Sequence, residues 1–348
     1  MKRHKQIENN PDDDTVVLLL QVPRTNDKKE LAAEQMFASL HGLLLFAPEK
    51  VFGASRRVRI SFEIAVLKRR IGFYVSVPQY LKGFVEEQIY AQYPMVQITE
   101  VEDYAIPTDT LHHNTLITEL ALSANQALPI KTFQSFEVDP LAAITATLAK
   151  FSEDEEAWIQ LIIKPAPENW HKKSEKYVNS LRTGGPASPL SLLGAAWKAP
   201  EDNASNKASL TEYEQARASG AEEKSHKLAF ETTLRIVYRG NNAVQEANLR
   251  LQSIIASYKQ FNTTYLNGFT QTKVFTSPEH LDSYRQRKLG RTPLLLNIEE
   301  VATLYHLPHT TVETPFILWA SSQTAEPPAN LPVMGEVDSS LISPIAVA

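Results

Sequence analysis

The chain has 348 residues, with 40 Asp and Glu against 35 Lys and Arg, so its formal net charge at pH 7 is −5. This length allows two or three domains, and the negative balance argues against a protein that holds nucleic acid by bulk positive charge. The sequence contains no cysteine, which excludes disulfides, thiol catalysis and cysteine-ligated metal sites.

The first 14 residues are polar and charged and end in three aspartates, so we expect a disordered tail at residues 1–14. This segment has no apolar core of the kind that a signal peptide needs. No apolar run in the sequence approaches the roughly 20 residues of a membrane-spanning helix. We therefore expect a cytoplasmic protein without a membrane span.

Residues 15–110 show the order strand, helix, strand, strand, helix, strand. The run from Arg57 to Leu67 alternates apolar and polar residues, which predicts a strand with one buried face. This order is typical of a ferredoxin-like (βαββαβ) domain, in which two helices cover one face of an antiparallel sheet. The expected strands are 15–22, 57–67, 71–77 and 96–101, and the expected helices are 27–44 and 79–93.

Residues 111–276 repeat this order with one long insertion, so we predict a duplicated domain. Asp139 followed by Pro140 is typical of a helix start, because an aspartate caps the helix and proline fits its first position. The expected strands are 130–136, 156–164, 228–239 and 263–269, and the second helix is expected at 242–261. The predicted fold class is α+β, with two tandem ferredoxin-like domains and antiparallel sheets.

The insertion in the second domain covers residues 166–226 and begins with a predicted helix at 169–181. We expect residues 200–225 to be flexible, because they are polar and have few aliphatic side chains. Residues 277–323 are expected to form a C-terminal helical extension. Residues 324–348 are rich in proline and are expected to be disordered.

No motif in this sequence is typical of an enzyme. It has no phosphate-binding loop of the Gly-x-x-x-x-Gly-Lys-Ser/Thr type and no His-Glu-x-x-His zinc motif. His112 and His113 could bind a metal together with Asp109, but nothing nearby completes a ligand set, so a loop pair without a role is the better interpretation. We therefore predict no catalytic residue, no cofactor and no metal site.

A basic cluster suggests one alternative function. The hairpin between the second and third strands is rich in Lys and Arg, and its second strand faintly resembles a strand signature of the RNA-recognition motif. A solvated hairpin tip is the simpler interpretation, and contact with DNA phosphates is the alternative. The candidate nucleic-acid residues are Arg56, Arg57, Arg59, Lys68, Arg69, Arg70 and Tyr74.

The stretch from Leu296 to Pro308 reads Leu-Asn-Ile-Glu-Glu-Val-Ala-Thr-Leu-Tyr-His-Leu-Pro. It resembles a segment found shortly before the motor domain in conjugative DNA-transfer ATPases of bacterial type IV secretion systems, above all those from bacteria of candidate phyla. Residues 60–64 and 71–93 share the resemblance, which covers roughly residues 15–330. The phosphate-loop and Mg²⁺-binding motifs of those ATPases are missing from this sequence, so the chain is expected to be either a standalone accessory protein or part of a split or truncated motor.

The resemblance implies a non-catalytic scaffold or protein-interaction module of a type IV secretion system for conjugative DNA transfer. Its expected partner is the motor ATPase or another secretion-complex protein, at the inner face of the cell membrane. The alternative is a nucleic-acid-binding module that uses the basic hairpin to contact DNA. The residues expected to contact the protein partner are Glu299, Glu300, Leu304, Tyr305 and His306.

Overall fold

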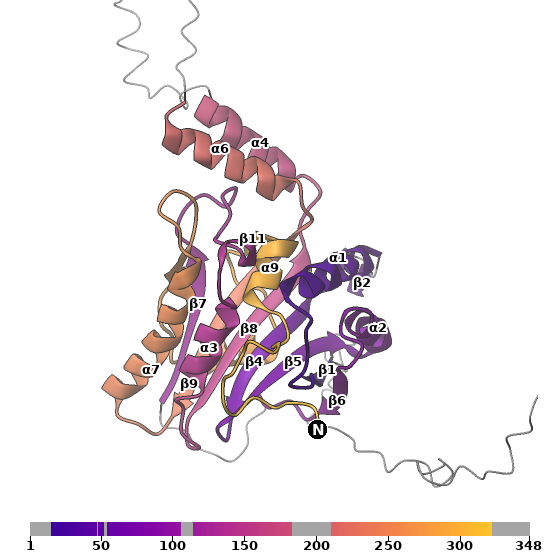
Figure 1. Cartoon of the computed structure of the whole chain (residues 1–348), viewed down its shortest axis with the longest axis vertical. Helices are drawn as coiled ribbons and strands as arrows, with labels where there is room; N and C mark the ends of the chain where they lie inside the picture. Colours follow the sequence, from indigo (N-terminus) through magenta and orange to yellow (C-terminus); the bar gives the residue numbers. More distant parts are fainter. Residues whose placement is uncertain (1–14, 47, 52–53, 106–113, 183–209, 322–348) are drawn as a thin grey trace, which may run out of the picture.

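The computed structural model of the chain describes residues 15–46, 48–51, 54–105, 114–182 and 210–321. The predicted tails, the pair His112 and His113, and residues 183–209 lie outside the described residues. Within them, the protein has an α+β fold built on one open antiparallel sheet (Figure 1). No helix in this described part is long and apolar enough to cross a membrane.

The main sheet has nine strands. Eight of them lie in the order β10-β7-β9-β8-β4-β5-β1-β6, and β11 pairs with the first residues of β9. All these pairs are antiparallel. The strands are β1 (Thr15–Gln21), β4 (Ile60–Leu67), β5 (Arg70–Pro78), β6 (Gln97–Val101), β7 (Asn114–Leu122), β8 (Glu156–Pro165), β9 (Ala229–Gly240), β10 (Phe269–Gln271) and β11 (Leu294–Asn297). A separate two-stranded ribbon joins β2 (Pro48–Val51) to β3 (Ala54–Arg57).

The strands and helices predicted for the first half are confirmed. Helix α1 (Glu30–Phe46) follows β1, and α2 (Lys82–Gln92) follows β5 after a short 3-10 turn. These elements could be predicted from the sequence because their apolar residues recur with the period of a strand or of a helix. The strands of this half lie in the order β4-β5-β1-β6.

The second half corrects two predicted strands. Its first strand is β7, which precedes the predicted strand 130–136, and residues 133–135 form a 3-10 turn instead. The backbone N–H of Ile130 donates to the Glu300 carboxylate, so this short apolar run is fixed by a distant side chain and not by a sheet. The closing strand β10 is only three residues long and begins at Phe269, where the predicted strand 263–269 ends.

The helices of the second half follow their predicted positions. Asp139 caps α3 (Pro140–Leu148), since its carboxylate accepts from the backbone N–H of Leu141 at 2.7 Å. Helix α7 (Val244–Ser257) follows β9, and α4 (Trp170–Arg182) opens the insertion. The strands of this half lie in the order β10-β7-β9-β8, which is equivalent to the order of the first half read from its own outer edge, β6-β1-β5-β4.

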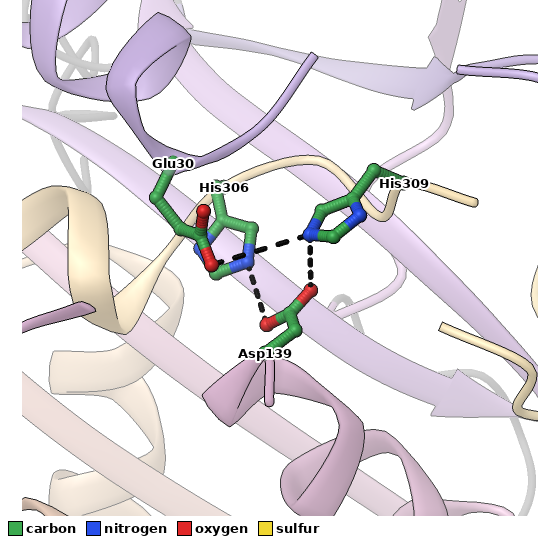
Figure 2. Close-up of side chains that lie close together, drawn as sticks. All are labelled: Glu30, Asp139, His306 and His309. Atoms are coloured by element: carbon green, nitrogen blue, oxygen red, sulfur yellow. Dashed lines mark hydrogen bonds and ion pairs between the residues drawn. The ribbon is translucent and has the colours of Figure 1, made fainter. Parts of the chain in front are cut away.

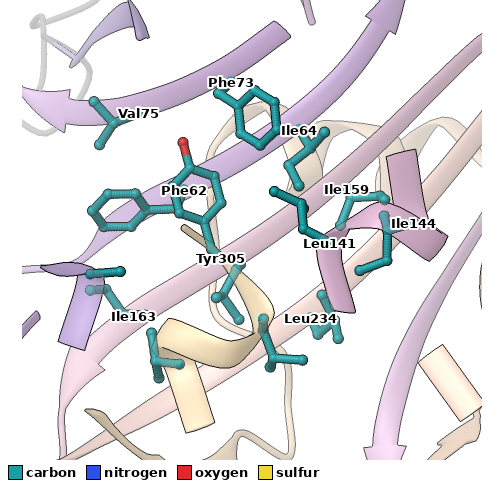
Figure 3. Packing of buried hydrophobic residues seen from close by; sticks show 14 of the residues in the cluster. Phe62, Ile64, Phe73, Val75, Leu141, Ile144, Ile159, Ile163, Leu234 and Tyr305 are labelled. Atoms are coloured by element: carbon teal, nitrogen blue, oxygen red, sulfur yellow. The ribbon is translucent and has the colours of Figure 1, made fainter. Parts of the chain in front are cut away.

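One sheet connects the two halves. Strand β4 of the first half pairs with β8 of the second, from Ile60 opposite Ile163 to Val66 opposite Ala157. The apolar residues of both halves form one continuous core under the helices. Figure 3 shows its centre, where Phe62 and Ile64 of β4 face Leu141 and Ile144 of α3, with Tyr305 beside them.

The second face of the central strands is also buried, which corrects the prediction of a strand with one buried face. On β4, Ser61, Glu63 and Ala65 are as inaccessible as the apolar residues between them. The cover comes from residues 101–105 and from α8 (Pro278–Arg285), which brings Tyr284 against Trp158 of β8. Alternating apolar and polar residues indicate that a strand has one apolar and one polar face. They do not indicate whether another segment of the chain covers the polar face.

The C-terminal region lies on both faces of the sheet. After α8 and β11, the short helix α9 (Ile298–Leu304) packs beside α1 on the helical face (Figure 1). Leu304 and Tyr305 are buried there. The Tyr305 ring lies 5.0 Å from that of Phe62, so this region completes the core.

The prediction that residues 200–225 are flexible is wrong from residue 210 onward. Residues 212–225 form helix α6 (Glu212–Ser225), whose start is fixed by a capping box between Thr211 and Glu214. Near its end, Lys224 is fully buried. The prediction relied on the polar composition of this segment. It overlooked the capping box at the start of the helix and the lysine near its end that points into the protein.

Alkaline pH is expected to unfold this protein in one cooperative step above pH 10. Burial, followed by the charge of Glu63, raises the pKa of Tyr74 to about 12. Burial also raises the pKa of Tyr93, Tyr104, Tyr238, Tyr258, Tyr284 and Tyr305. The unfolded chain loses these protons near pH 10, so the stability that they contribute is complete below pH 10 and falls as pH rises toward 12.

Tyrosinate absorbance and far-ultraviolet circular dichroism, recorded on the same samples, check this expectation. The late part of the absorbance change should coincide with the loss of circular dichroism. Gradual, complete tyrosinate formation with unchanged circular dichroism would contradict it.

Candidate functional site

The predicted basic cluster is divided between the two ends of a strand. Lys68 and Arg69 form the tight turn between β4 and β5, both with positive φ, and they are exposed together with Arg70. Arg59 precedes the other end of β4, roughly 25 Å away for a strand of this length. Its guanidinium donates to the backbone carbonyl of Arg287 at 2.9 Å. Arg56 and Arg57 lie on β3, next to Arg59 in the chain and not at the turn.

Tyr74 does not offer a surface for base stacking, which corrects its predicted role. Its side chain is 6% exposed and lies in the covered second face of the sheet. The ring of Tyr104 packs against it, with 5.0 Å between the ring centroids. An aromatic that stacks on bases must be open to solvent, so Tyr74 serves packing instead.

The residues predicted to contact a partner through α9 face the interior of this protein. Glu299, Glu300, Leu304, Tyr305 and His306 are all buried. In this conformation they are therefore unavailable to a partner. The docking surface was an expectation from the resemblance of this segment, and the burial of its residues corrects that expectation.

Glu300 forms a fully buried ion pair with Lys224 of α6, and neither side chain has any exposed surface. The Lys224 ammonium donates to this carboxylate at 3.0 Å and to the backbone carbonyls of Leu295 and Leu128 at 2.7 and 3.2 Å. Burial lowers the pKa of Lys224 although the nearby carboxylate opposes that effect. The pair fixes the end of α6 to the body of the protein.

Helices α4 and α6 form a hairpin that projects from the end of the sheet (Figure 1). Val178 of α4 packs against Ala218 and Ala221 of α6, and the hydroxyl of Ser174 donates to the carbonyl of Ala221 at 3.2 Å. Helix α4 exposes three lysines, Lys172, Lys173 and Lys176, which form its basic side, and it also exposes Glu175.

A cleft of about 600 Å³ lies where the hairpin meets the body. Trp170 and Lys173 of α4 line one side, and Pro293 and Leu294 line another. An apolar floor beside an exposed lysine offers both packing surface and charge to a ligand or partner. This cleft and the basic side of α4 are continuous through Lys173.

A row of polar side chains, buried except for the partly exposed Glu119, crosses the second face of the sheet. Glu63, Gln160, Arg235 and Glu119 stand side by side on β4, β8, β9 and β7. The Gln160 amide donates to Glu63 at 2.9 Å and accepts from Arg235 at 2.9 Å. Arg287 adds a contact of 3.1 Å to Glu63, and two carboxylates hold its pKa above the ordinary value although burial opposes this. These groups satisfy one another, which favours a structural role.

A second buried cluster brings together two carboxylates and two imidazoles. It consists of Glu30 at the start of α1, Asp139 at the start of α3, and His306 and His309 in the segment after α9. One ligand atom from each residue lies within 4.8 Å of every other (Figure 2). The Nε2 atoms of His306 and His309 lie 2.9 and 3.0 Å from the two oxygens of Asp139.

The charges in this cluster depend on one another. Burial alone would raise the pKa of the Asp139 carboxyl, but the charge of His306 and its hydrogen bond hold that pKa well below the ordinary value. Burial alone would lower the pKa of His306, but the Asp139 carboxylate raises it above the ordinary value. Asp139 and His306 therefore stabilise each other's charged forms.

Sequence reasoning missed this cluster. The histidines are three residues apart, which is a ligand spacing, but the partners Glu30 and Asp139 come from other parts of the chain. Asp139 was recognised only as a helix cap. The only local indication of a metal site in this segment was the pair His306 and His309, next to a proline that ends a helix. Two histidines without the carboxylates do not predict a metal site.

Residues 2–320 match the family defined by a domain of unknown function, DUF8128. The match covers most of the chain, so this protein belongs to that family. No curated protein of known function matches the sequence.

Proposed function

We propose that this protein is a non-catalytic scaffold that holds a partner protein through the α4–α6 hairpin. One observation carries the proposal: the hairpin is anchored by a fully buried ion pair, while its helix α4 exposes three lysines. Because the α4–α6 hairpin is held in place, it loses little conformational freedom when a partner binds, and this favours binding. The cleft at its base adds apolar surface around Trp170.

The partner that we propose is the motor ATPase of a type IV secretion system for conjugative DNA transfer. The resemblance of residues 296–308 to the segment before such motors supports this choice. Under this proposal the protein works in the cytoplasm, at the inner face of the membrane, and reaches the membrane through its partners. An acidic surface on the ATPase would complement the lysines of α4.

We also propose that the scaffold arose from two ferredoxin-like units. In each half, the strands taken in chain order lie in the sequence fourth, first, third, second across the sheet. That is the order of the ferredoxin-like arrangement, with the helices on one face. The paired strands β4 and β8 hold equivalent places in the two halves, and the hairpin replaces the tight turn that joins β4 to β5.

Binding between the purified protein and the purified motor ATPase, measured by titration calorimetry, tests the proposed function. Replacing Lys172, Lys173 and Lys176 together with glutamate is expected to weaken binding at least tenfold, because charge attraction becomes repulsion. The matched control replaces Lys68, Arg69 and Arg70 with glutamate at the β4–β5 turn, where binding should change less than twofold.

The two triple variants also separate the alternatives. If the turn variant alone weakens ATPase binding, the hairpin is not the contact. If the protein binds duplex DNA in a salt-dependent mobility shift, and the turn variant abolishes that shift, the nucleic-acid function replaces the scaffold function. Failure of the native protein to bind the ATPase at all contradicts the proposed partner.

A further inference from the structure

The cluster of Glu30, Asp139, His306 and His309 contains buried polar atoms that the protein leaves without a good partner. The Oδ2 atom of Asp139 and the Nε2 atom of His309 lie 3.0 Å apart, but neither makes a hydrogen bond of good geometry. Both residues are more than nine-tenths buried. A buried polar atom without a hydrogen bond costs stability, so each atom calls for a further partner.

The imidazoles are held as metal ligands usually are. The Nδ1 atom of His306 lies 2.9 Å from the backbone carbonyl of Ala302, which can only accept, so Nδ1 carries a proton. In a neutral ring the lone pair is then on Nε2, which points at Asp139. The Nδ1 atom of His309 is 3.2 Å from the hydroxyl of Thr311, which can likewise accept its proton. Such outer hydrogen bonds fix the tautomer that binds a metal.

The charge of the cluster also calls for a cation. Glu30 and Asp139 bring two carboxylates into a site whose imidazoles are neutral in the ligand tautomer. A divalent ion would balance both charges. Buried charges in proteins are paired or coordinate metals, because an unpaired charge inside a protein is expensive.

We propose that Glu30, Asp139, His306 and His309 bind one divalent transition-metal ion, and that the ion is Zn²⁺. Two imidazoles and two carboxylates suit Zn²⁺, whereas Mg²⁺ and Ca²⁺ prefer oxygen ligands alone. Four protein ligands fill a tetrahedron and leave no open position, so the site is structural. Tetrahedral ligands at about 2.0–2.2 Å from zinc lie roughly 3.3–3.6 Å from each other. The spacings to the two Asp139 oxygens, 2.9 and 3.0 Å, are shorter than this range, and that from His309 to Glu30, 4.0 Å, is longer. All four ligand atoms lie within 4.8 Å of one another, so small side-chain shifts would bring them to a common ion.

The ion would join segments that are distant in the chain. Glu30 begins helix α1 of the first half of the fold, Asp139 caps helix α3 of the second half, and the histidines lie in the segment that follows α9. Because the unfolded chain does not hold these residues together, metal binding would stabilise the folded state. Zn²⁺ would therefore act as a clamp between the two halves.

The test starts from full-length protein stripped with a chelator and titrated with ZnCl₂ against a chromophoric zinc chelator. We expect one Zn²⁺ per chain, confirmed by mass spectrometry of the metal content, and a higher melting temperature with Zn²⁺ than with MgCl₂. Cobalt substitution should give the intense visible absorption of a four-coordinate ion. No stoichiometric Zn²⁺, or an equal response to Mg²⁺, overturns the proposal.

Three variants locate the ion. Glu30→Gln and His309→Gln are each expected to weaken Zn²⁺ binding by at least 10–100-fold, the loss that follows removal of even an outer-shell partner. Glu30 is partly exposed, so its variant should fold normally, which circular dichroism checks. His171→Gln on α4 is the control and should bind as the native protein does. Native-like binding by both cluster variants means that Zn²⁺ binds elsewhere and overturns the assignment.

Discussion

Replacing Glu300 with glutamine is expected to lower the free energy of unfolding by about 3–5 kcal/mol, the cost of breaking a buried ion pair. The amide keeps the size of the side chain and can still accept from Ile130. It removes the charge that balances the fully buried Lys224 ammonium. Urea unfolding at pH 7, followed by circular dichroism, measures the change.

The loss in Glu300→Gln should become smaller as pH rises from 7 to 9. Burial already lowers the pKa of Lys224 in the native protein, and removing the carboxylate lowers it further. The unfolded chain then binds more protons than the folded one, so the free energy of unfolding rises with pH up to the ordinary lysine pKa.

The double variant Lys224→Met, Glu300→Gln provides the control. It should be at least about 1 kcal/mol more stable than the sum of the two single changes predicts, because it leaves no unpaired charge. Strict additivity, or a cost below 1 kcal/mol for Glu300→Gln, would show that the pair contributes little.

Arg287→Met is expected to cost about 3–5 kcal/mol, because it leaves the Glu63 carboxylate buried without its cation. Glu63 is completely buried, and Arg287 also binds Asp103. The same side chain holds the segment after α8 against the second face of the sheet. Urea unfolding measures the loss, and faster proteolysis near residues 285–290 should accompany it.

The matched control is Arg182→Met, which breaks an ion pair with Glu222 on the surface of the hairpin. Half-exposed pairs of this kind contribute less than about 1 kcal/mol, since solvent screens them. A second control, Glu63→Gln with Arg287→Met, should recover part of the loss. If Arg287→Met costs no more than Arg182→Met, the buried row does not hold the C-terminal segment in place.

Most helices and strands of this protein could be predicted because their signals are local. The alternation from Val58 to Val66 marks β4, and Asp139 before Pro140 marks the start of α3. Such patterns reflect side-chain direction and capping within a few residues. Predictions failed where the local signal was short, as at 130–136, or where composition concealed a helix, as in α6.

The candidate site could not be predicted, because its parts are distant in the chain. His306 and Asp139 are 167 positions apart, and no pattern in either segment refers to the other. The same holds for Arg287 and Glu63, which are 224 positions apart. From the sequence, His306 was interpreted only as a docking side chain and Asp139 only as a helix cap.

The sequence by itself determined the α+β class and most of the helices and strands, since these follow from periodicity and capping. Only the tertiary structure decided that β4 and β8 join both halves into one sheet, and that the polar face of that sheet is buried. It also decided which charges meet inside the protein. The reason is physical: strand pairing and charge pairing depend on positions in space, which a local pattern of residues does not encode.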